Sequence, residues 1–252
     1  MFVLARVAEA GGWWRTGSPY RGIQKKAMDI AVEKINAKGG IKGRPLQIVA
    51  EDSKSEPKDS AQIAQKFTSD AKIVATENYF DRDKDFTGVL TTLRGSRPDA
   101  LYIATMYNDG ALMSKQREKL GWNDVAVFGP GSLYSPKLLE LGGSSVEGLR
   151  TSSIFMITDS RPEVQEFIKT FKTRNNGVDP NMFAAIAYDA INIMANAIEK
   201  AGTDRKAIRD ELAKMKNYVG MTGKFGFTER RDVKRDYHYL IVKSGAWTLL
   251  DK

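Results

Sequence analysis

Three stretches of the sequence combine the residue types that hold a small polar ligand. They read "GGWWRTGSPY" (residues 11–20), "MYNDG" (106–110) and "FGPGSLYSP" (128–136), and each follows a strand-like run. Each joins a flexible glycine to an aromatic ring and to hydroxyl or amide groups, which can enclose a ligand and bond its polar ends. The same residue types also build ordinary turns. Because all three fall on one edge of the expected sheet, the sequence favours a small-molecule binding site.

The residues that catalysis commonly uses are scarce. No nucleophile elbow, phosphate-binding lysine loop, zinc-protease motif or dinucleotide fingerprint follows an expected strand. The chain has one histidine, His238, inside an alternating strand-like run, and no cysteine. Two carboxylate pairs, Asp81/Asp83 and Glu51/Asp52, fall where loops and helix starts are expected, so caps explain them better than acid–base chemistry. We therefore expect no enzyme, no metal site and no cofactor.

The composition describes a globular chain with a mixed surface. In 252 residues, Lys and Arg outnumber Asp and Glu by 39 to 31, a net charge of +8. Acidic residues interrupt the basic ones throughout, as in "TERRDVKRD", so the charge does not indicate a nucleic-acid partner. No apolar run is long enough to cross a bilayer, and the start "MFVLARVAEAGG" lacks the features of a signal peptide. Without cysteines, disulfides are excluded.

Strands and helices alternate in the first half of the chain. Apolar spacing and glycine or proline boundaries predict strands at 2–8, 46–50, 72–79, 100–106 and 125–128. The intervening helices are expected from Ile23 to Gly39-Gly40, from Pro57 to about residue 69, over 85–94, and over 108–120 with Asn108 as cap. This strand–helix–strand order predicts a parallel sheet with right-handed crossovers.

The pattern changes in the second half. A short helix in "SPKLLELGG" and a strand in "EGLRTSSIF" come first. Three helices then follow without intervening strands, at 162–174, 181–201 and 204–216. The tail alternates between apolar and polar residues, and Ser244-Gly245 is expected to form a hairpin turn. We assign no role to His238 in this tail.

Nearly the whole chain, from Arg21 to Leu250, resembles one family of proteins. The most specific segments are "INAKGGIKGRPLQIV" (35–49) and "AAIAYDA" (184–190). They resemble the type I periplasmic solute-binding proteins of the branched-chain amino-acid (Leu/Ile/Val-binding) family of ABC transporters. Two further segments, "YNDGAL" and "YSPKLLELGG", are most similar to a subgroup that accepts aromatic and other carboxylates as well as amino acids.

The resemblance implies an α/β fold of two Rossmann-like lobes, with parallel sheets and flanking helices, that closes on a small ligand. The first lobe would comprise residues 1–70 and 159–216, and the second residues 71–158 and 217–252. The function implied is delivery of an amino acid or related small carboxylate to an ABC permease in the periplasm. No nucleic acid, membrane insertion or cofactor is implied.

A large middle segment of the family pattern is missing here. The helix in "SAQIAQKFTSD" leads directly to "KIVATENYF", an inner strand of the second lobe in the family. The missing segment contains the loops that hold the ligand carboxylate in the family, so we expect weakened or altered binding. An engineered deletion, a natural truncated paralogue and a partial sequence all remain open. Exposed sheet edges left by the loss could support a homodimer.

The resemblance also implies the residues of the ligand site. The first lobe would contribute aromatic walls and the second lobe Tyr107, Asn108 and hydrogen-bonding groups around Ser132. Gly131 stands where the family places the acidic residue that binds the ligand's amino group. Asp109 could replace that acid, although a role in capping its helix is preferred. The expected ligand-binding residues are Trp13, Trp14, Tyr20, Tyr107, Asn108, Gly131, Ser132 and Tyr188.

Three alternatives stay open at this stage. The five strands of the first half could recombine into a single flavodoxin-like doubly wound sheet. The chain could also be an engineered or structural α/β scaffold without a ligand. A flavodoxin-like protein that binds FMN rests on topology alone, because the loop after the first strand lacks a hydroxyl-rich phosphate cradle.

Overall fold

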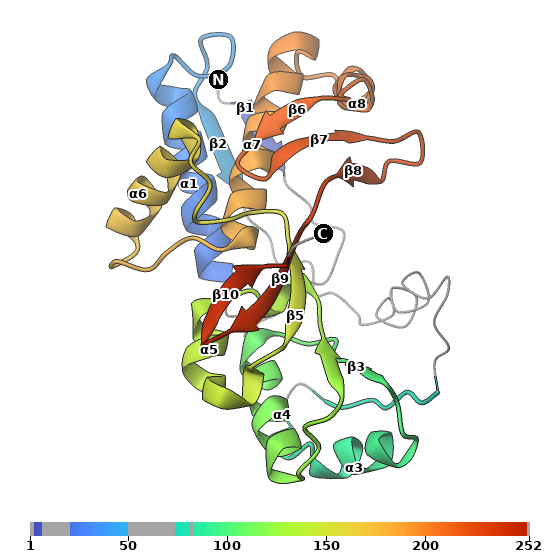
Figure 1. Ribbon diagram of the computed structural model, residues 1–252. Helices are drawn as coiled ribbons and strands as arrows, with labels where there is room; N and C mark the ends of the chain where they lie inside the picture. The colour runs from blue at the N-terminus through green and yellow to red at the C-terminus, as the bar shows by residue number, and fades with distance from the viewer. Residues whose placement is uncertain (1–2, 7–20, 50–73, 81–82, 251–252) are drawn as a thin grey trace. The chain divides into compact units, whose positions relative to one another are not determined.

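The computed structural model describes residues 3–6, 21–49, 74–80 and 83–250 (Figure 1). The chain forms two compact units, and each is built from two separate segments. Unit 1 comprises Met1–Glu56 and Ile154–Asp236, and unit 2 comprises Pro57–Ser153 and Tyr237–Lys252. The chain therefore passes between the units more than once.

Unit 1 combines a short parallel sheet, several helices and an antiparallel ribbon. Strand β1 (Val3–Arg6) pairs in parallel with β2 (Leu46–Val49), and Val3 lies opposite Leu46. The ribbon consists of β6 (Tyr218–Gly220), β7 (Gly223–Phe227) and β8 (Val233–Arg235), in that order. The helices are α1 (Arg21–Ala37), α6 (Pro162–Arg174), α7 (Met182–Ala201) and α8 (Arg205–Ala213).

Apolar spacing explains why these helices pack together. On α1, Ala27, Ile30 and Ala31 recur at helical spacing and are almost completely buried. They join a core that α6 supplies with Phe167 and Phe171 and to which α7 contributes its apolar side. The helices begin where side chains cap them, since Asn181 accepts a hydrogen bond from the Ala184 N–H and Asp204 accepts one from the Ala207 N–H.

Unit 2 is a five-stranded mixed sheet with helices packed against it. The strand order is β10-β9-β5-β4-β3, with β3, β4 and β5 parallel and β9 antiparallel to β5. These strands are β3 (Ala100–Tyr102), β4 (Ala126–Phe128), β5 (Arg150–Ser153), β9 (His238–Lys243) and β10 (Ala246–Leu249). The helical elements are α3 (Thr87–Gly95), α4 (Tyr107–Lys119), η1 (Gly131–Leu133), α5 (Pro136–Gly142) and η2 (Gly143–Val146).

The two faces of this sheet differ. Leu101, Val127 and Val242 are buried and belong to the core of unit 2. The residues that alternate with them along the strands, including Tyr102, Phe128 and Tyr239, are exposed. The helices α4 and α5 lie side by side (Figure 1), and they supply Met113 and Leu138 to the same core.

Several sequence predictions are confirmed in the described residues. Helix α6 has the predicted bounds, and α7 begins within one residue of the prediction. Strands β9 and β10 form the predicted hairpin, with positive φ angles at Ser244 and Gly245. His238 lies exposed in β9. The predicted helix that starts at Pro57 lies outside the described residues.

The predicted strand at 72–79 is wrong for the part that the structure describes. Residues 74–80 have no regular secondary structure, and the side chains of Val74 and Phe80 are 51% and 80% exposed. Tyr79 instead packs its ring edge-on against Phe86 and donates from Oη to the Ala104 carbonyl at 3.2 Å. The β-branched and aromatic residues that suggested a strand thus have no strand partner here, and strand formation depends on one.

Two predicted boundaries also change. Strand β3 ends at Tyr102 rather than residue 106, because the Thr105 N–H turns back to the Ile103 carbonyl at 3.0 Å. Helix α4 begins at Tyr107 with Met106 as its N-cap, so Asn108 is a helical residue and not the cap.

The alternative of a single flavodoxin-like sheet is wrong for the described strands. Strands β1 and β2 pair with each other, while β3, β4 and β5 belong to another sheet, completed by β9 and β10. Residues 217–236, which the predicted lobes assign to the second lobe, lie in unit 1. The reason is local, since the β6–β7 turn is bonded to Asp189 of α7. The division into lobes of a binding protein stays a prediction.

Candidate functional site

The candidate site is built at the carboxyl edge of the parallel strands of unit 2. The sheet ladder continues just past the strands, since the Ile103 N–H donates to Phe128 O at 2.8 Å and the Gly129 N–H donates to Arg150 O at 3.0 Å. The loops that follow β3 and β4 therefore leave the sheet side by side. This edge is where open α/β sheets place their ligands.

Hydroxyl groups brace these two loops against each other. The Ser132 hydroxyl is buried and donates to Thr105 O at 2.6 Å, which joins the loop after β4 to the loop after β3. From β5, the Thr151 hydroxyl bonds to the carbonyls of Pro130 at 2.8 Å and Gly129 at 3.1 Å. A site whose loops are fixed in advance loses less conformational entropy when a ligand binds.

Close packing at Gly129 adds to this bracing. A Cβ atom at Gly129 would lie 2.2 Å from Leu133 Cδ1 and 3.0 Å from the Ile103 carbonyl oxygen. Leu133 is completely buried, so it has no room to move aside. Because position 129 is a glycine, Leu133 of η1 can pack directly against the backbone of the loop after β4 and hold that loop against the sheet.

The first residues of α4 supply polar side chains at the carboxyl edge of the unit 2 sheet. Tyr107 is half-buried against the core of unit 2, whereas Asn108 is exposed. Asp109 is the acidic residue of the first turn, where a carboxylate favours the positive end of the helix dipole. An amide, a phenol and a carboxylate at one helix start can hydrogen-bond a small polar molecule, and Asp109 could also pair with an ammonium group.

Four of the expected ligand-binding residues lie together in unit 2, and a fifth, Tyr188, belongs to unit 1. Tyr107 and Asn108 begin α4, and Gly131 and Ser132 lie in η1, which is joined to the loop before α4. The Ser132 hydroxyl proton is directed to Thr105, so its oxygen is better placed to accept than to donate. The remaining expected residues of the first lobe, Trp13, Trp14 and Tyr20, lie outside the described residues.

Tyr188 is a core residue of unit 1. Its ring lies 4.8 Å from that of Phe167, measured between centroids, and its side chain belongs to the apolar core. Burial raises the pKa of its phenol. Its position on α7 indicates packing, and nothing about its surroundings requires a ligand.

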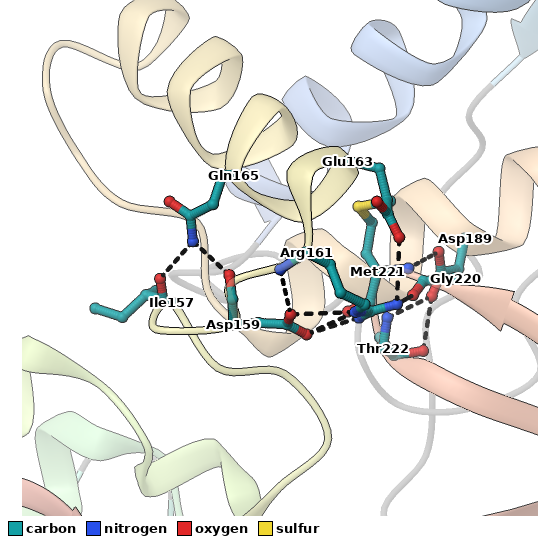
Figure 2. A network of polar contacts seen from close by, with 9 residues as sticks. All are labelled: Ile157, Asp159, Arg161, Glu163, Gln165, Asp189, Gly220, Met221 and Thr222. Atoms are coloured by element: carbon teal, nitrogen blue, oxygen red, sulfur yellow. Dashed lines mark hydrogen bonds and ion pairs between the residues drawn. The ribbon is translucent and has the colours of Figure 1, made fainter.

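Asp189, which follows Tyr188 in the segment "AAIAYDA", is the polar residue of that segment (Figure 2). The buried Asp189 carboxylate accepts hydrogen bonds from the Met221 N–H at 2.7 Å, the Thr222 N–H at 2.9 Å and the Thr222 hydroxyl at 2.7 Å. Burial raises its pKa, although these donors act in the opposite direction. Sequence reasoning missed this role, and the signal was an acid inside the apolar stripe of "AAIAYDA".

Sequence reasoning also missed Thr105 and Thr151. Both fall inside runs that read as strands, and only the structure shows that their hydroxyl or carbonyl groups meet the loop after β4. Asp83, one of the carboxylates noted in the sequence, accepts from the Phe80 N–H at 2.8 Å and serves a turn. Among the described residues, no group of three or more His, Asp or Glu side chains could hold a metal ion.

Comparison with known proteins identifies the family. The family model described as "Periplasmic binding protein" matches residues 18–76 and 68–245. The chain belongs to the periplasmic binding protein family. The resemblance noted in the sequence is thereby confirmed, and the match in two pieces fits a family member that lacks a middle segment.

Curated relatives of this family member carry related names. A "Leucine-, isoleucine-, valine-, threonine-, and alanine-binding protein" of Pseudomonas aeruginosa is 26% identical over 164 residues, which is 65% of this chain and 43% of the relative. A "Leu/Ile/Val-binding protein homolog 3" of Brucella melitensis is 25% identical over 63% of this chain and 44% of the relative. The matched region thus spans less than half the length of these relatives.

Solved structures share the fold. A branched-chain amino acid transporter substrate-binding protein from Streptococcus pneumoniae, solved with isoleucine, has a TM-score of 0.77 at 19% identity, covering 93% of this chain and 96% of that one. A solute-binding protein of an ABC transporter from R. palustris, solved with benzoate, has a TM-score of 0.75 at 13% identity, covering 98% and 94%. The fold is therefore that of type I periplasmic binding proteins, as predicted. In the described part of the chain, no helix is long and apolar enough to span a membrane.

Proposed function

We propose that this protein is the solute-binding component of an ABC importer for branched-chain amino acids or related small carboxylates, with binding weakened by the missing middle segment. Membership in the periplasmic binding protein family supports a binding function rather than catalysis. The observation that carries the proposal is the pair of braced loops at the carboxyl edge of unit 2, with Tyr107, Asn108 and Asp109 at the helix start.

The ligand class follows from two sources. The relatives are named for leucine, isoleucine, valine, threonine and alanine, and the neighbours of the same fold hold isoleucine and benzoate. The helix start of α4 suits this class, because its first N–H groups favour a carboxylate and Asp109 favours an ammonium group. Branched-chain amino acids and small aromatic carboxylates are thus the first ligands to test.

The partner and the location follow from the proposed function. An importer component delivers its ligand to an ABC permease, and the family description "Periplasmic binding protein" supports a location in the periplasm. A homodimer could form through the sheet edges, since β3 and β10 are the outer strands of the unit 2 sheet. Sedimentation equilibrium of the whole chain measures that oligomeric state.

Isothermal titration calorimetry with leucine, isoleucine, valine, threonine, alanine and benzoate tests the proposal. We expect a saturable heat with at least one of them. Asn108→Ala should weaken that binding about tenfold, which corresponds to the loss of one hydrogen bond of about 1.4 kcal/mol. Asn108 is exposed, so the variant should fold.

Asn123→Ala is the matched control, because Asn123 is also an exposed asparagine of unit 2 but lies before β4, at the opposite end of the strand from the candidate site. Its affinity should equal that of the wild type. Heats absent for all six compounds, from a protein that unfolds cooperatively, would contradict the proposal and favour the alternative of an α/β scaffold without a ligand.

A further inference from the structure

Two passages of the chain between the units lie in the described residues. At the entry crossing, Ser153 to Ile154, the chain enters unit 1 and continues to α6. At the exit crossing, Asp236 to Tyr237, the chain leaves unit 1 directly after β8. More than eighty residues separate these crossings in the sequence, yet the chain next to each crossing contacts the same ribbon, formed by β6, β7 and β8.

The residues that follow the entry crossing are fixed to the start of α6 (Figure 2). The Gln165 amide donates to the carbonyls of Ile157 at 3.2 Å and Asp159 at 2.5 Å. Asp159 and Arg161 form an ion pair in which Nη2 lies 2.7 Å from Oδ2, while Nε lies 3.1 Å from Oδ1 and 3.0 Å from Oδ2. Such a bidentate pair has a defined geometry.

Arg161 also reaches the turn between β6 and β7. Its Nη1 donates to Gly220 O at 2.9 Å and its Nη2 donates to Met221 O at 3.3 Å. The segment after the entry crossing is therefore attached to the ribbon as well as to α6, and the attachment passes through one guanidinium group.

Asp189 holds the same turn from the other side. It accepts the N–H groups of Met221 and Thr222, while Arg161 donates to the carbonyls of Gly220 and Met221. The turn approaches α7 so closely that a Cβ atom at Gly220 would lie 2.4 Å from Asp189 Oδ1. The backbone of the β6–β7 turn therefore bonds to both the Asp189 carboxylate and the Arg161 guanidinium. The close packing at Gly220 leaves this turn little room to move.

The exit crossing is attached to the same ribbon. Arg235, the last residue of β8, pairs with Phe225 of β7, and its guanidinium lies over the Phe225 ring at 4.4 Å from the centroid. An arginine over an aromatic face is held by cation–π attraction. The last residue but one before the chain leaves unit 1 is therefore fixed to the strand that follows the Asp189-bound turn.

We propose that the β6–β7 ribbon, anchored by Asp189, couples the entry and exit crossings, so that loosening one end of the segment 154–236 also loosens the other end. Arg161 and Asp189 act in this device as positioning residues, because both bond to the backbone of the β6–β7 turn. The inference goes beyond the proposed function and does not depend on ligand binding, because every contact in it lies within unit 1.

Hydrogen–deuterium exchange of the whole chain with Arg161→Gln tests the coupling. This variant removes the ion pair to Asp159 and the bonds to the turn, and it leaves the Arg235 side chain and the Phe225 ring in place. We expect about tenfold faster exchange in a peptide covering 157–165 and, because of the coupling, a comparable increase in a peptide covering 223–236. Acceleration confined to 157–165 would overturn the proposal.

Two further variants sharpen the test. Phe225→Leu removes the ring beneath Arg235 at the exit crossing and should accelerate exchange at 157–165, whereas unchanged exchange there would contradict the coupling. Arg209→Gln is the matched control, since Arg209 forms an exposed ion pair with Asp210 on α8, and it should leave both peptides at the wild-type rate. If Arg161→Gln fails to fold, Arg161→Lys keeps a charge for Asp159 without bridging to the turn. Faster exchange in both peptides, 157–165 and 223–236, would then support the coupling, and faster exchange in 157–165 alone would contradict it.

Discussion

Neighbouring residues of one helix perform different tasks in this protein. Tyr188 of α7 packs its ring into the core of unit 1, and Asp189, the next residue, directs its carboxylate to the β6–β7 turn. Successive helical residues point about 100° apart, so an apolar and a polar contact can alternate along one element. The burial of the carboxylate is compensated by three donors, which is the condition under which a protein tolerates such a group.

Tyr218, at the start of the same ribbon, provides a prediction on pH dependence. Burial, with the nearby charges of Asp189 and Tyr188, raises the pKa of its phenol from 10.0 to about 12. In the unfolded chain the phenol loses its proton first, so between pH 10 and 12 the folded state binds more protons than the unfolded state. The free energy of unfolding should therefore fall as the pH rises through this range.

Urea denaturation of the wild type and of Tyr218→Phe at several pH values measures this effect. The wild type should lose stability relative to the variant between pH 10 and 12, and the difference between them should stay constant from pH 7 to 9. A difference that is constant up to pH 12 would contradict a raised pKa at Tyr218.

The braced loop after β4 allows a prediction for an element. Gly129→Ala places a methyl group against the buried Leu133 and the Ile103 carbonyl, so we expect a loss of about 1–3 kcal/mol in the free energy of unfolding. Gly88→Ala on α3 is the matched control, because nothing outside its chain neighbours and the nearby backbone of α3 lies within 4 Å of the added methyl group, and alanine favours a helix. Chemical denaturation measures both, and equal stability of the two variants would contradict the locked loop.

Elements were predictable where the sequence decides them locally. Helix α6 has its predicted bounds because Pro162 suits the first helical position and Val164, Phe167, Ile168 and Phe171 form one buried stripe. Residues 74–80 misled the prediction because strand formation requires a partner that local sequence does not reveal.

The candidate site was partly predictable for the same reason. Tyr107, Asn108, Gly131 and Ser132 belong to short polar stretches whose composition is visible in the sequence. Thr105 lies in the loop after β3 and Thr151 lies on β5, and both bond to the loop after β4. The bond from Ser132 to Thr105 joins residues 27 positions apart. Such contacts depend on strand order, which composition does not encode.

At the scale of the whole molecule, the described residues form two separate apolar cores. The core of unit 1 gathers residues such as Phe167, Phe171 and Ile191, and that of unit 2 gathers residues such as Phe86, Leu133 and Leu138, with no described residue in both. Since each unit has its own core, each should unfold as its own cooperative step. Differential scanning calorimetry should then resolve two transitions.

Core substitutions assign these transitions. Leu138→Ala and Phe171→Ala each remove a completely buried side chain, one from each unit, and should cost about 2–5 kcal/mol. Leu138→Ala should lower one transition temperature and leave the other in place, and Phe171→Ala should do the reverse. A single transition that both variants lower equally would mean that the units unfold together, and the two cores would then act as one cooperative structure despite their separate membership.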